Sequence, residues 1–248
     1  MDFTLERYGE LLAALKDSGI DYSLRHDVDL RPDRALRVAE LEKAAGITAS
    51  YYFREANFDS DADTIRRIAA MGHTIGYHYE SLTTCYGNMS AAYNDFCRNL
   101  ERLRRLVPVN TACAHGSPGS PWDSQDIWKE HDIHVLGIEY EPMLDTDFSR
   151  TLYLTDTGRR WDGWRMSVRD KVPQYQRQWE QEGLRFRTTN DILQALANPN
   201  HPIHNRNLLV NTHPQRWMPF SPQWVKEVTI QKIKNIAKWA IVEFRQHK

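Results

Sequence analysis

The segment SLRHDVDLRP, residues 23–32, has the pattern of a short strand that ends in two carboxylates. Asp27 and Asp29 are two residues apart, so on a strand both side chains lie on one face, which they share with Arg25. Neighbouring carboxylates repel each other unless a positive charge compensates, as a divalent cation does. The segment therefore predicts a cation site. A polar turn that caps the next helix is the alternative, although Asp33 already suits that role.

Three histidines, His78, His115 and His213, stand at or just after the C-terminal ends of expected strands. Parallel α/β folds carry their chemistry at this edge of the sheet. Imidazole binds divalent ions and transfers protons near neutral pH, so carboxylates and histidines together favour metal-assisted acid–base chemistry. Glu80 shares a strand face with His78. His73 lies on the opposite face, and we expect it to be structural.

The elements that position these residues alternate between helix and strand patterns. The expected helices cover residues 3–18, 32–45, 61–71, 90–106 and 222–246. The expected strands cover residues 21–29, 47–55, 73–80, 111–114, 133–139, 151–154 and 208–211. Strands separated by helices imply right-handed crossovers and a mainly parallel sheet. The sequence therefore predicts a single α/β domain over residues 1–248, an irregular (β/α)7-type barrel.

Composition narrows the class of protein. The 248 residues include 32 Lys and Arg against 33 Asp and Glu, and this balance argues against a general nucleic-acid binder. The three cysteines, Cys85, Cys97 and Cys113, form no CxxC pair, which favours a reducing compartment. Neither a signal-peptide pattern nor an apolar run of about 20 residues is present. We therefore expect a cytoplasmic protein with no membrane span.

The arrangement resembles the polysaccharide deacetylases, the NodB-like carbohydrate esterase family 4, over most of residues 22–216. The family's first motif is a strand that ends TFDDG, and LRHDVDL stands in its place. Asp27 matches the first aspartate, which is the general base in the family. Val28 occupies the position of the family's metal-binding aspartate. The resemblance therefore implies Asp29 as the carboxylate ligand.

GHTIGYH, residues 72–78, matches the family's second motif, GHEIGxH, and His78 corresponds to its first histidine ligand. The second ligand of the family would be Leu82, which cannot coordinate a cation. We expect His115, in ACAHGSP near the family's Arg-Pro motif, to be the third ligand, with Glu80 as the alternative. One carboxylate and two imidazoles reproduce the charge balance of the family site.

LLVNTHP, residues 208–214, matches the family's last motif, in which a strand ends in a histidine that acts as general acid. The resemblance thus assigns that role to His213. The histidine needs a nearby carboxylate to remain protonated, and Asp156 and Asp162 are both candidates.

We expect the substrate to contact Arg25, Glu80 and Trp217. Trp161, Trp164 and Trp217 could form an apolar platform for a sugar ring, but core packing is the interpretation that we favour for each.

Together these features predict a metal-dependent deacetylase of an N- or O-acetylated sugar. Zinc is the first expected cation, with cobalt, nickel or manganese as alternatives. The expected substrate is a glycan precursor made in the cytoplasm for surface-polysaccharide biosynthesis. Two alternatives remain open: a related hydrolase of a non-sugar amide that works without a metal, and an inert barrel that binds a glycan or a protein.

Overall fold

The computed structural model describes residues 1–117, 119–163, 167 and 169–246. The internal contacts divide the chain into two compact units. Unit 1 comprises Met1–Ser23 and Phe148–Lys248, and unit 2 comprises Leu24–Asp147.

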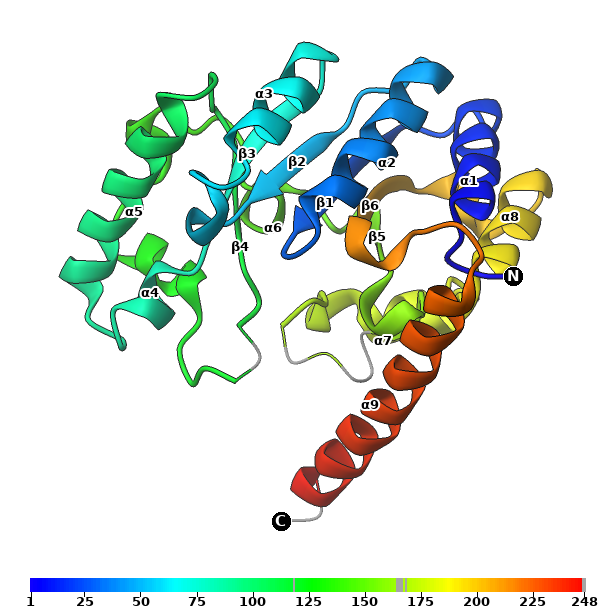
Figure 1. Ribbon diagram of the computed structural model, residues 1–248. Helices are drawn as coiled ribbons and strands as arrows, with labels where there is room; N and C mark the ends of the chain where they lie inside the picture. The colour runs from blue at the N-terminus through cyan, green and yellow to red at the C-terminus, as the bar shows by residue number, and fades with distance from the viewer. Residues whose placement is uncertain (118, 164–166, 168, 247–248) are drawn as a thin grey trace. The chain divides into compact units, whose positions relative to one another are not determined.

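Unit 2 contains a parallel sheet in the strand order β4-β3-β2-β1 (Figure 1). Its strands are β1 (Tyr22–Val28, whose first two residues belong to unit 1), β2 (Ser50–Phe53), β3 (Thr74–Tyr79) and β4 (Ala112–Ala114). The register places Asp27 opposite Tyr52 and His78 opposite Cys113. Because all four strands run in the same direction, the residues that follow them meet at one edge of the sheet.

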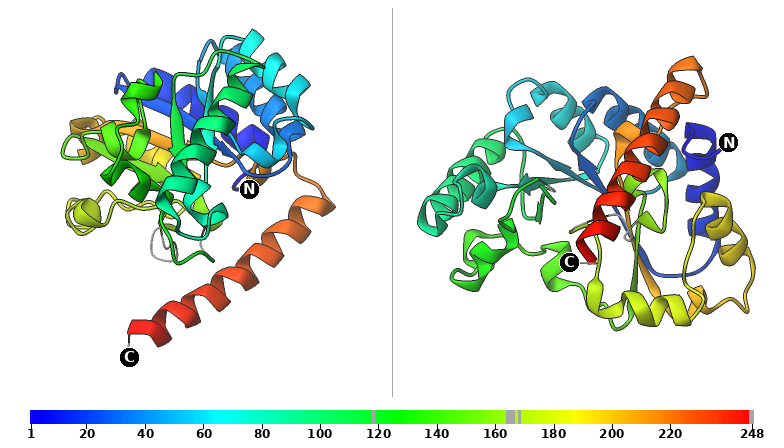
Figure 2. Two further views of the ribbon diagram at one scale, coloured as in Figure 1. Left: turned by 90° about the vertical axis from the view of Figure 1, so that its left-hand side faces the viewer. Right: turned by 90° about the horizontal axis from the view of Figure 1, so that it is seen from below.

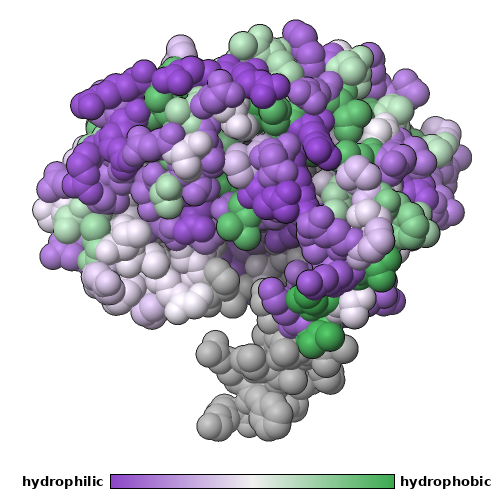
Figure 3. Space-filling model, viewed as in Figure 1, coloured by the Kyte–Doolittle hydropathy of each residue, from purple (hydrophilic) through white to green (hydrophobic). Residues whose placement is uncertain are grey.

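The helices of unit 2 are α2 (Pro32–Ala45), α3 (Ala62–Ala70), α4 (Ser81–Thr84), α5 (Met89–Arg104) and α6 (Pro142–Asp145). Figures 1 and 2 show α2 and α3 running along one face of β1, β2 and β3. The inner side of α3 buries Ile65 and Ile68, whereas the outer surface over α2 and α3 is mainly hydrophilic (Figure 3). Helix α2 ends at Gly46, which adopts the left-handed conformation with φ 70° that glycine favours.

A buried polar cluster lies on the side of the unit 2 sheet opposite Asp27. The Glu42 carboxylate is 2.7 Å from His26 Nε2 and accepts a hydrogen bond from the Tyr51 hydroxyl at 2.5 Å. His73 Nε2 donates to the Ala39 carbonyl oxygen at 3.1 Å. These contacts confirm the structural role predicted for His73. They also show that the alternating side chains of β1 serve two separate polar groups.

Unit 1 contains the parallel strands β5 (Thr151–Thr155) and β6 (Asn207–Thr212). Its helices include α1 (Leu5–Asp17), α7 (Pro173–Gln181), α8 (Thr189–Ala197) and α9 (Pro222–Gln246). The Leu208 amide donates to the Asp21 carbonyl oxygen at 2.9 Å, just before β1 begins. The rings of Phe3, Tyr8 and Trp161 pack around Trp217, which has no exposed surface.

The parallel strands and their helical connections confirm the predicted fold class, an irregular α/β barrel. The helices predicted at 32–45 and 222–246 have the predicted bounds. The strand predicted at 133–139 is wrong, because His134–Leu136 forms a 3-10 turn that ends at Gly137 with φ 73°. Helices α7 and α8 were not predicted, and the single-domain organisation stays a prediction. Among the described residues, none of the helices combines the length and the apolar character that crossing a bilayer requires.

Gly76, within the segment GHTIGYH, is required by close packing. A Cβ atom at this position would overlap with Tyr52 Cδ1, and the Tyr52 ring is buried with its hydroxyl 2.8 Å from Thr111 Oγ1. We expect Gly76→Ala to lower the free energy of unfolding by about 1–3 kcal/mol, because the ring must move. Urea unfolding followed by circular dichroism measures this change.

Gly9→Ala is the matched control, because a Cβ at Gly9 in helix α1 meets no atom within 4 Å. It should leave the stability unchanged or raise it by up to about 1 kcal/mol. Equal stability of the two variants would contradict the packing argument.

Candidate functional site

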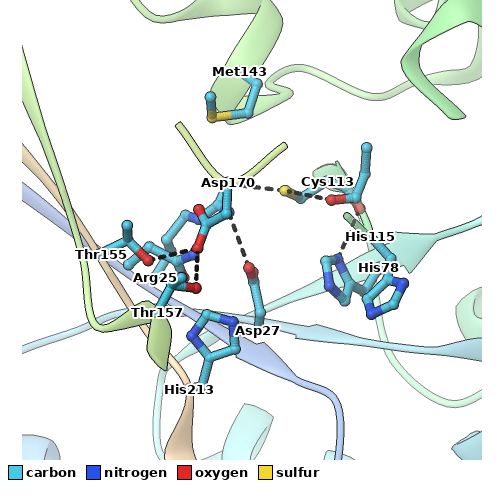
Figure 4. A network of polar contacts seen from close by, with 12 residues as sticks. Arg25, Asp27, His78, Cys113, His115, Met143, Thr155, Thr157, Asp170 and His213 are labelled. Carbon is cyan, nitrogen blue, oxygen red and sulfur yellow. Dashed lines mark hydrogen bonds and ion pairs between the residues drawn. The ribbon is translucent and has the colours of Figure 1, made fainter. Parts of the chain in front are cut away.

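Three of the predicted ligands come together at the C-terminal edge of the unit 2 sheet. Asp29 Oδ1 lies 3.5 Å from His78 Nε2 and 3.4 Å from His115 Nε2. Donor atoms of all three residues lie within 4.8 Å of one another. The His78 and His115 rings meet edge to face, with their centroids 5.1 Å apart (Figure 4). Asp29 follows β1, His78 belongs to β3, and His115 follows β4.

The spacing of these donors fits a small divalent cation. Ligand bonds of about 2.0–2.2 Å in a tetrahedral arrangement separate neighbouring donors by about 3.3–3.6 Å. The two separations from Asp29 Oδ1, 3.4 and 3.5 Å, lie in this range. The Asp29 and His115 side chains are 20% and 17% exposed, so solvent reaches the group from one side. Three protein ligands with an accessible side are typical of a catalytic metal site rather than a structural one.

Backbone contact orients His78. Its Nδ1 atom lies 3.0 Å from the carbonyl oxygen of Cys113, its register partner on β4. A carbonyl oxygen can only accept, so Nδ1 carries a proton, and Nε2 is the nitrogen that points toward Asp29 and can bind a cation. A lone pair that faces a carboxylate is unfavourable unless a proton or a cation lies between them. The hydrogen bond thus prepares His78 as a ligand.

The Glu80 carboxylate and Ser117 contact the second nitrogen of His115, and the Ser117 amide donates to this nitrogen at 3.2 Å. His115 Nδ1 lies 2.9 Å from Ser117 Oγ and 3.2 Å from Glu80 Oε2. The other oxygen of Glu80 accepts hydrogen bonds from Arg54, and Ser117 Oγ donates to Glu80 Oε2 at 3.1 Å. A ligating histidine whose second nitrogen faces a carboxylate is a recurrent feature of metal sites. The sequence indicated Glu80 as a substrate contact or an alternative ligand, and it did not reveal this contact with His115.

The pKa values of this group show how its charges are coupled. Burial alone would lower the pKa of His115, but its contacts with Asp29 and Glu80 raise it to about 9. Burial alone would raise the pKa of Glu80, but His115 and Arg54 lower it to about 2. Without a cation, a proton on His115 therefore compensates the two carboxylates at neutral pH.

Asp27 lies beside this group in a pairing with Arg25 on the same face of β1. The Arg25 guanidinium donates to Asp27 Oδ2 at 3.1 Å and to Cys113 Sγ at 2.8 Å (Figure 4). All three side chains are buried. An oxygen of Asp27 and a ring nitrogen of His78 also lie within 4.8 Å of each other and of the Cys113 sulfur. Asp27 is thus close to the ligand set without belonging to it.

Leu82, at the position where the resemblance implies a second histidine ligand, lies in an apolar environment. Its side chain is 2% exposed and packs with Ala92 and Ile127 in an apolar cluster. An imidazole at this position would be buried among apolar side chains. The second imidazole of the ligand set comes instead from His115, which the chain supplies after the next strand.

In unit 1, Asp156 is the carboxylate that contacts His213. Asp156 Oδ1 lies 2.7 Å from His213 Nδ1, and Asp156 Oδ2 accepts from the His213 amide at 3.0 Å. The same carboxylate accepts from Trp217 Nε1 at 2.8 Å and from the Arg216 guanidinium. Burial would raise the pKa of Asp156, but Arg216 and His213 lower it to about 2. Asp162, the other candidate, pairs instead with Arg160 and Arg185.

Burial supports core packing, rather than a sugar platform, for Trp161 and Trp217. Trp217 has no exposed surface and Trp161 is 3% exposed, so neither ring can stack on a sugar. Trp217 contributes its indole N–H to Asp156 instead. Trp164 lies outside the described residues. The substrate contact predicted for Arg25 remains a prediction, because the described contacts of Arg25 are with Asp27, Cys113 and the Tyr52 ring.

A further polar group in unit 1 escaped the sequence analysis. The Asp170 carboxylate accepts hydrogen bonds from the hydroxyls of Tyr153, Thr155 and Thr157, at 2.6, 2.7 and 2.5 Å (Figure 4). Tyr153 and Thr155 are two residues apart on β5, so their side chains lie on the same face of the strand. This spacing is visible in the sequence. The acceptor, Asp170, lies 15 residues after Thr155 in a segment with no clear helix or strand pattern, so the sequence does not reveal the contact.

No family model and no curated protein matches this chain. Among solved structures, it is similar to a CE4 family pseudoenzyme from Bacillus anthracis in its wild-type form, at 13% identity and a TM-score of 0.43. That match covers 88% of this chain and 61% of the other. A mutant of the pseudoenzyme gives 12% identity and a TM-score of 0.44, covering 88% of this chain and 63% of the other. A mutant of the pseudoenzyme with restored enzymatic activity gives 13% identity and a TM-score of 0.43, covering 88% of this chain and 63% of the other.

This chain therefore spans less than two thirds of the length of these chains. They belong to the family that the sequence motifs resemble. Similarity at this level assigns no activity and no residue role, so the function must be argued from the residues of this chain.

Cation binding should release a proton from His115. At pH 7 its ring is protonated in the absence of a cation, because its pKa is about 9, and only the neutral nitrogen can bind a cation. The apparent affinity for Zn²⁺ should therefore rise between pH 6 and pH 9, by up to about tenfold per pH unit. Calorimetric titrations in two buffers with different heats of ionisation count the released protons. A binding heat that is independent of the buffer would show that His115 is not a ligand.

Glu80→Gln should weaken Zn²⁺ binding by about 10–100-fold, because the variant loses the charge that orients His115. Competition with a chromophoric chelator at pH 8 measures the affinity. Glu101→Gln is the matched control, since Glu101 pairs with Arg104 on the exposed side of α5. Equal affinities for the two variants would contradict the role given to Glu80.

Proposed function

We propose that this protein is a metal-dependent hydrolase that removes acetyl groups from an N- or O-acetylated sugar. The observation that carries the proposal is the grouping of Asp29, His78 and His115, with donor atoms within 4.8 Å of one another. The second nitrogen of each ring has a partner, the Cys113 carbonyl for His78 and Glu80 for His115. A group held in this way has the donors and the orientation of a catalytic cation site.

Asp27 has the properties of a proton acceptor beside this site. A divalent cation bound there would polarise the acetyl carbonyl and lower the pKa of a coordinated water. The Arg25 guanidinium donates to Asp27 Oδ2 at 3.1 Å, so a positive charge lies directly beside this carboxylate. An ionised carboxylate next to the reacting water can take its proton, as the family resemblance implies for Asp27.

His213 is the residue that we propose as proton donor to the departing amine or alcohol. Asp156 Oδ1 lies 2.7 Å from His213 Nδ1, and Asp156 Oδ2 accepts from the His213 amide at 3.0 Å. One carboxylate therefore holds both the ring and the backbone of His213. The Asp156 carboxylate and the Arg216 guanidinium, whose Nη1 lies 2.7 Å from His213 Nδ1, both contact this side of the ring. The proton at Nε2 is then the one that His213 transfers.

The finer parts of the proposal rest on the sequence. Zinc is the cation that we propose, with cobalt, nickel and manganese as alternatives, because one carboxylate and two imidazoles suit these ions. The proposed substrate class is a glycan precursor of surface-polysaccharide biosynthesis, and the proposed location is cytoplasmic.

Asp27→Asn tests this function. The variant should lower the rate of acetate release from N-acetylglucosamine oligomers, or from an O-acetylated sugar, by about 10²–10⁴-fold. Its metal content should remain that of the wild type, because Asp27 is not among the three ligands. Acetate release and metal analysis on protein purified without chelators measure both quantities. Asp59→Asn is the matched control, since the Asp59 side chain is 91% exposed and pairs only with Arg102 in the described contacts.

Each other outcome has a distinct meaning. Loss of the metal in Asp27→Asn would show that the roles of Asp27 and Asp29 are exchanged. Hydrolysis by metal-free wild type would identify a metal-independent hydrolase. A wild type that binds the metal and releases no acetate from any acetylated sugar would support the inert barrel.

A further inference from the structure

A second set of possible ligands overlaps the first. Asp27, His78 and Cys113 also have donor atoms within 4.8 Å of one another, and all three side chains are buried. The two sets share His78 but differ in chemistry, since the second one replaces an imidazole by a sulfur. Thiolate ligands attract zinc and other soft ions strongly. The region therefore offers a cation two possible sets of ligands, which compete for His78.

The Arg25 guanidinium occupies the second set. Its Nη1 donates to Cys113 Sγ at 2.8 Å and its Nη2 donates to Asp27 Oδ2 at 3.1 Å, so one side chain engages two of the three donors. Arg25 is 4% exposed, and its guanidinium lies 5.7 Å from the centre of the Tyr52 ring. A guanidinium remains positively charged at any pH at which the protein is folded. The second set is therefore filled by a fixed positive charge.

The positions of these residues in the sheet explain how Arg25 can contact both Asp27 and Cys113. Arg25 and Asp27 alternate along β1 and share a face, while Cys113 lies on β4 opposite His78 on β3. The Arg25 side chain thus extends from β1 across β2 and β3 to the Cys113 thiol on β4. In contrast, Asp29 and His115 are 20% and 17% exposed, so a cation can reach the first set from solvent.

We propose that Arg25 determines which donors bind the cation: it excludes the ion from Asp27, His78 and Cys113 and leaves Asp29, His78 and His115 as the metal site. The proposal rests on the metal centre of the proposed function. Its consequence is that Asp27 stays available as a proton acceptor, because a carboxylate that ligates a cation directly is a much weaker base. Cys113 likewise stays outside the coordination sphere.

Cobalt titration tests this assignment, because Co²⁺ substitutes for zinc and reports its ligands by absorption. The titrations use full-length protein with a phosphine reductant. Wild type should bind one Co²⁺ per chain and show no sulfur-to-cobalt charge-transfer band in the near ultraviolet. Arg25→Gln, which removes the charge, should acquire that band. Arg25→Lys, which keeps the charge, should lack it, so a change caused by packing alone is distinguished from one caused by charge.

The double variant Arg25→Gln, Cys113→Ser identifies the sulfur. It should lose the band, because Cys85 and Cys97 remain and do not contribute. A sulfur band in the wild type, or a folded Arg25→Gln protein without one, would overturn the proposal. Far-ultraviolet circular dichroism establishes that each variant is folded.

X-ray absorption of the zinc-loaded wild type keeps the proposal testable if Arg25→Gln does not fold. The zinc shell should contain only nitrogen and oxygen, and a zinc–sulfur distance would overturn the proposal. A wild type that binds neither Co²⁺ nor Zn²⁺ would remove the metal centre itself, and with it both proposals. Failure of the Arg25 assignment alone leaves one bound ion in the wild type, so the two failures are distinct.

Discussion

The candidate site depends on the hydrogen bond between His78 Nδ1 and the Cys113 carbonyl oxygen, 3.0 Å long. It places a proton on Nδ1, and it turns Nε2 toward Asp29. Since the acceptor is the backbone of the neighbouring strand, the orientation comes from the β3–β4 register rather than from a side chain that could rotate. A change in that register would remove the ligand even with every residue retained.

Charge in the site is balanced by a small number of close contacts. Arg54 contacts Glu80, Glu80 contacts His115, and both imidazoles approach Asp29. Each buried or half-buried carboxylate therefore has a cationic partner, as the cost of burying a charge requires. A divalent ion would take the place of the proton on His115, whose pKa the contacts with Asp29 and Glu80 raise to about 9. The contacts in the protein without an ion thus suit the exchange of the His115 proton for a divalent cation.

The face on which each residue of β1 lies separates structural from chemical roles. His26 points into the buried cluster with Glu42 and Tyr51, whereas Arg25 and Asp27 point toward Cys113 and the ligand set. Both groups are polar and buried, so burial alone does not distinguish them. What distinguishes them is accessibility: the first cluster is closed by the α2 helix, whereas Asp29 and His115 are exposed to solvent on one side.

The sequence by itself determined the features that depend on neighbours along the chain. Alternation placed Arg25 and Asp27 on one face, apolar runs located β1, β3 and β6, and Gly46 ended α2. The tertiary structure alone decided contacts that the sequence left open or did not show: Glu80 beside His115, Asp156 rather than Asp162 beside His213, and Trp217 inside the core. Secondary structure follows from the local geometry of the backbone. The partner of a charged side chain depends instead on how segments far apart in the chain pack together. That packing cannot be deduced from a single sequence.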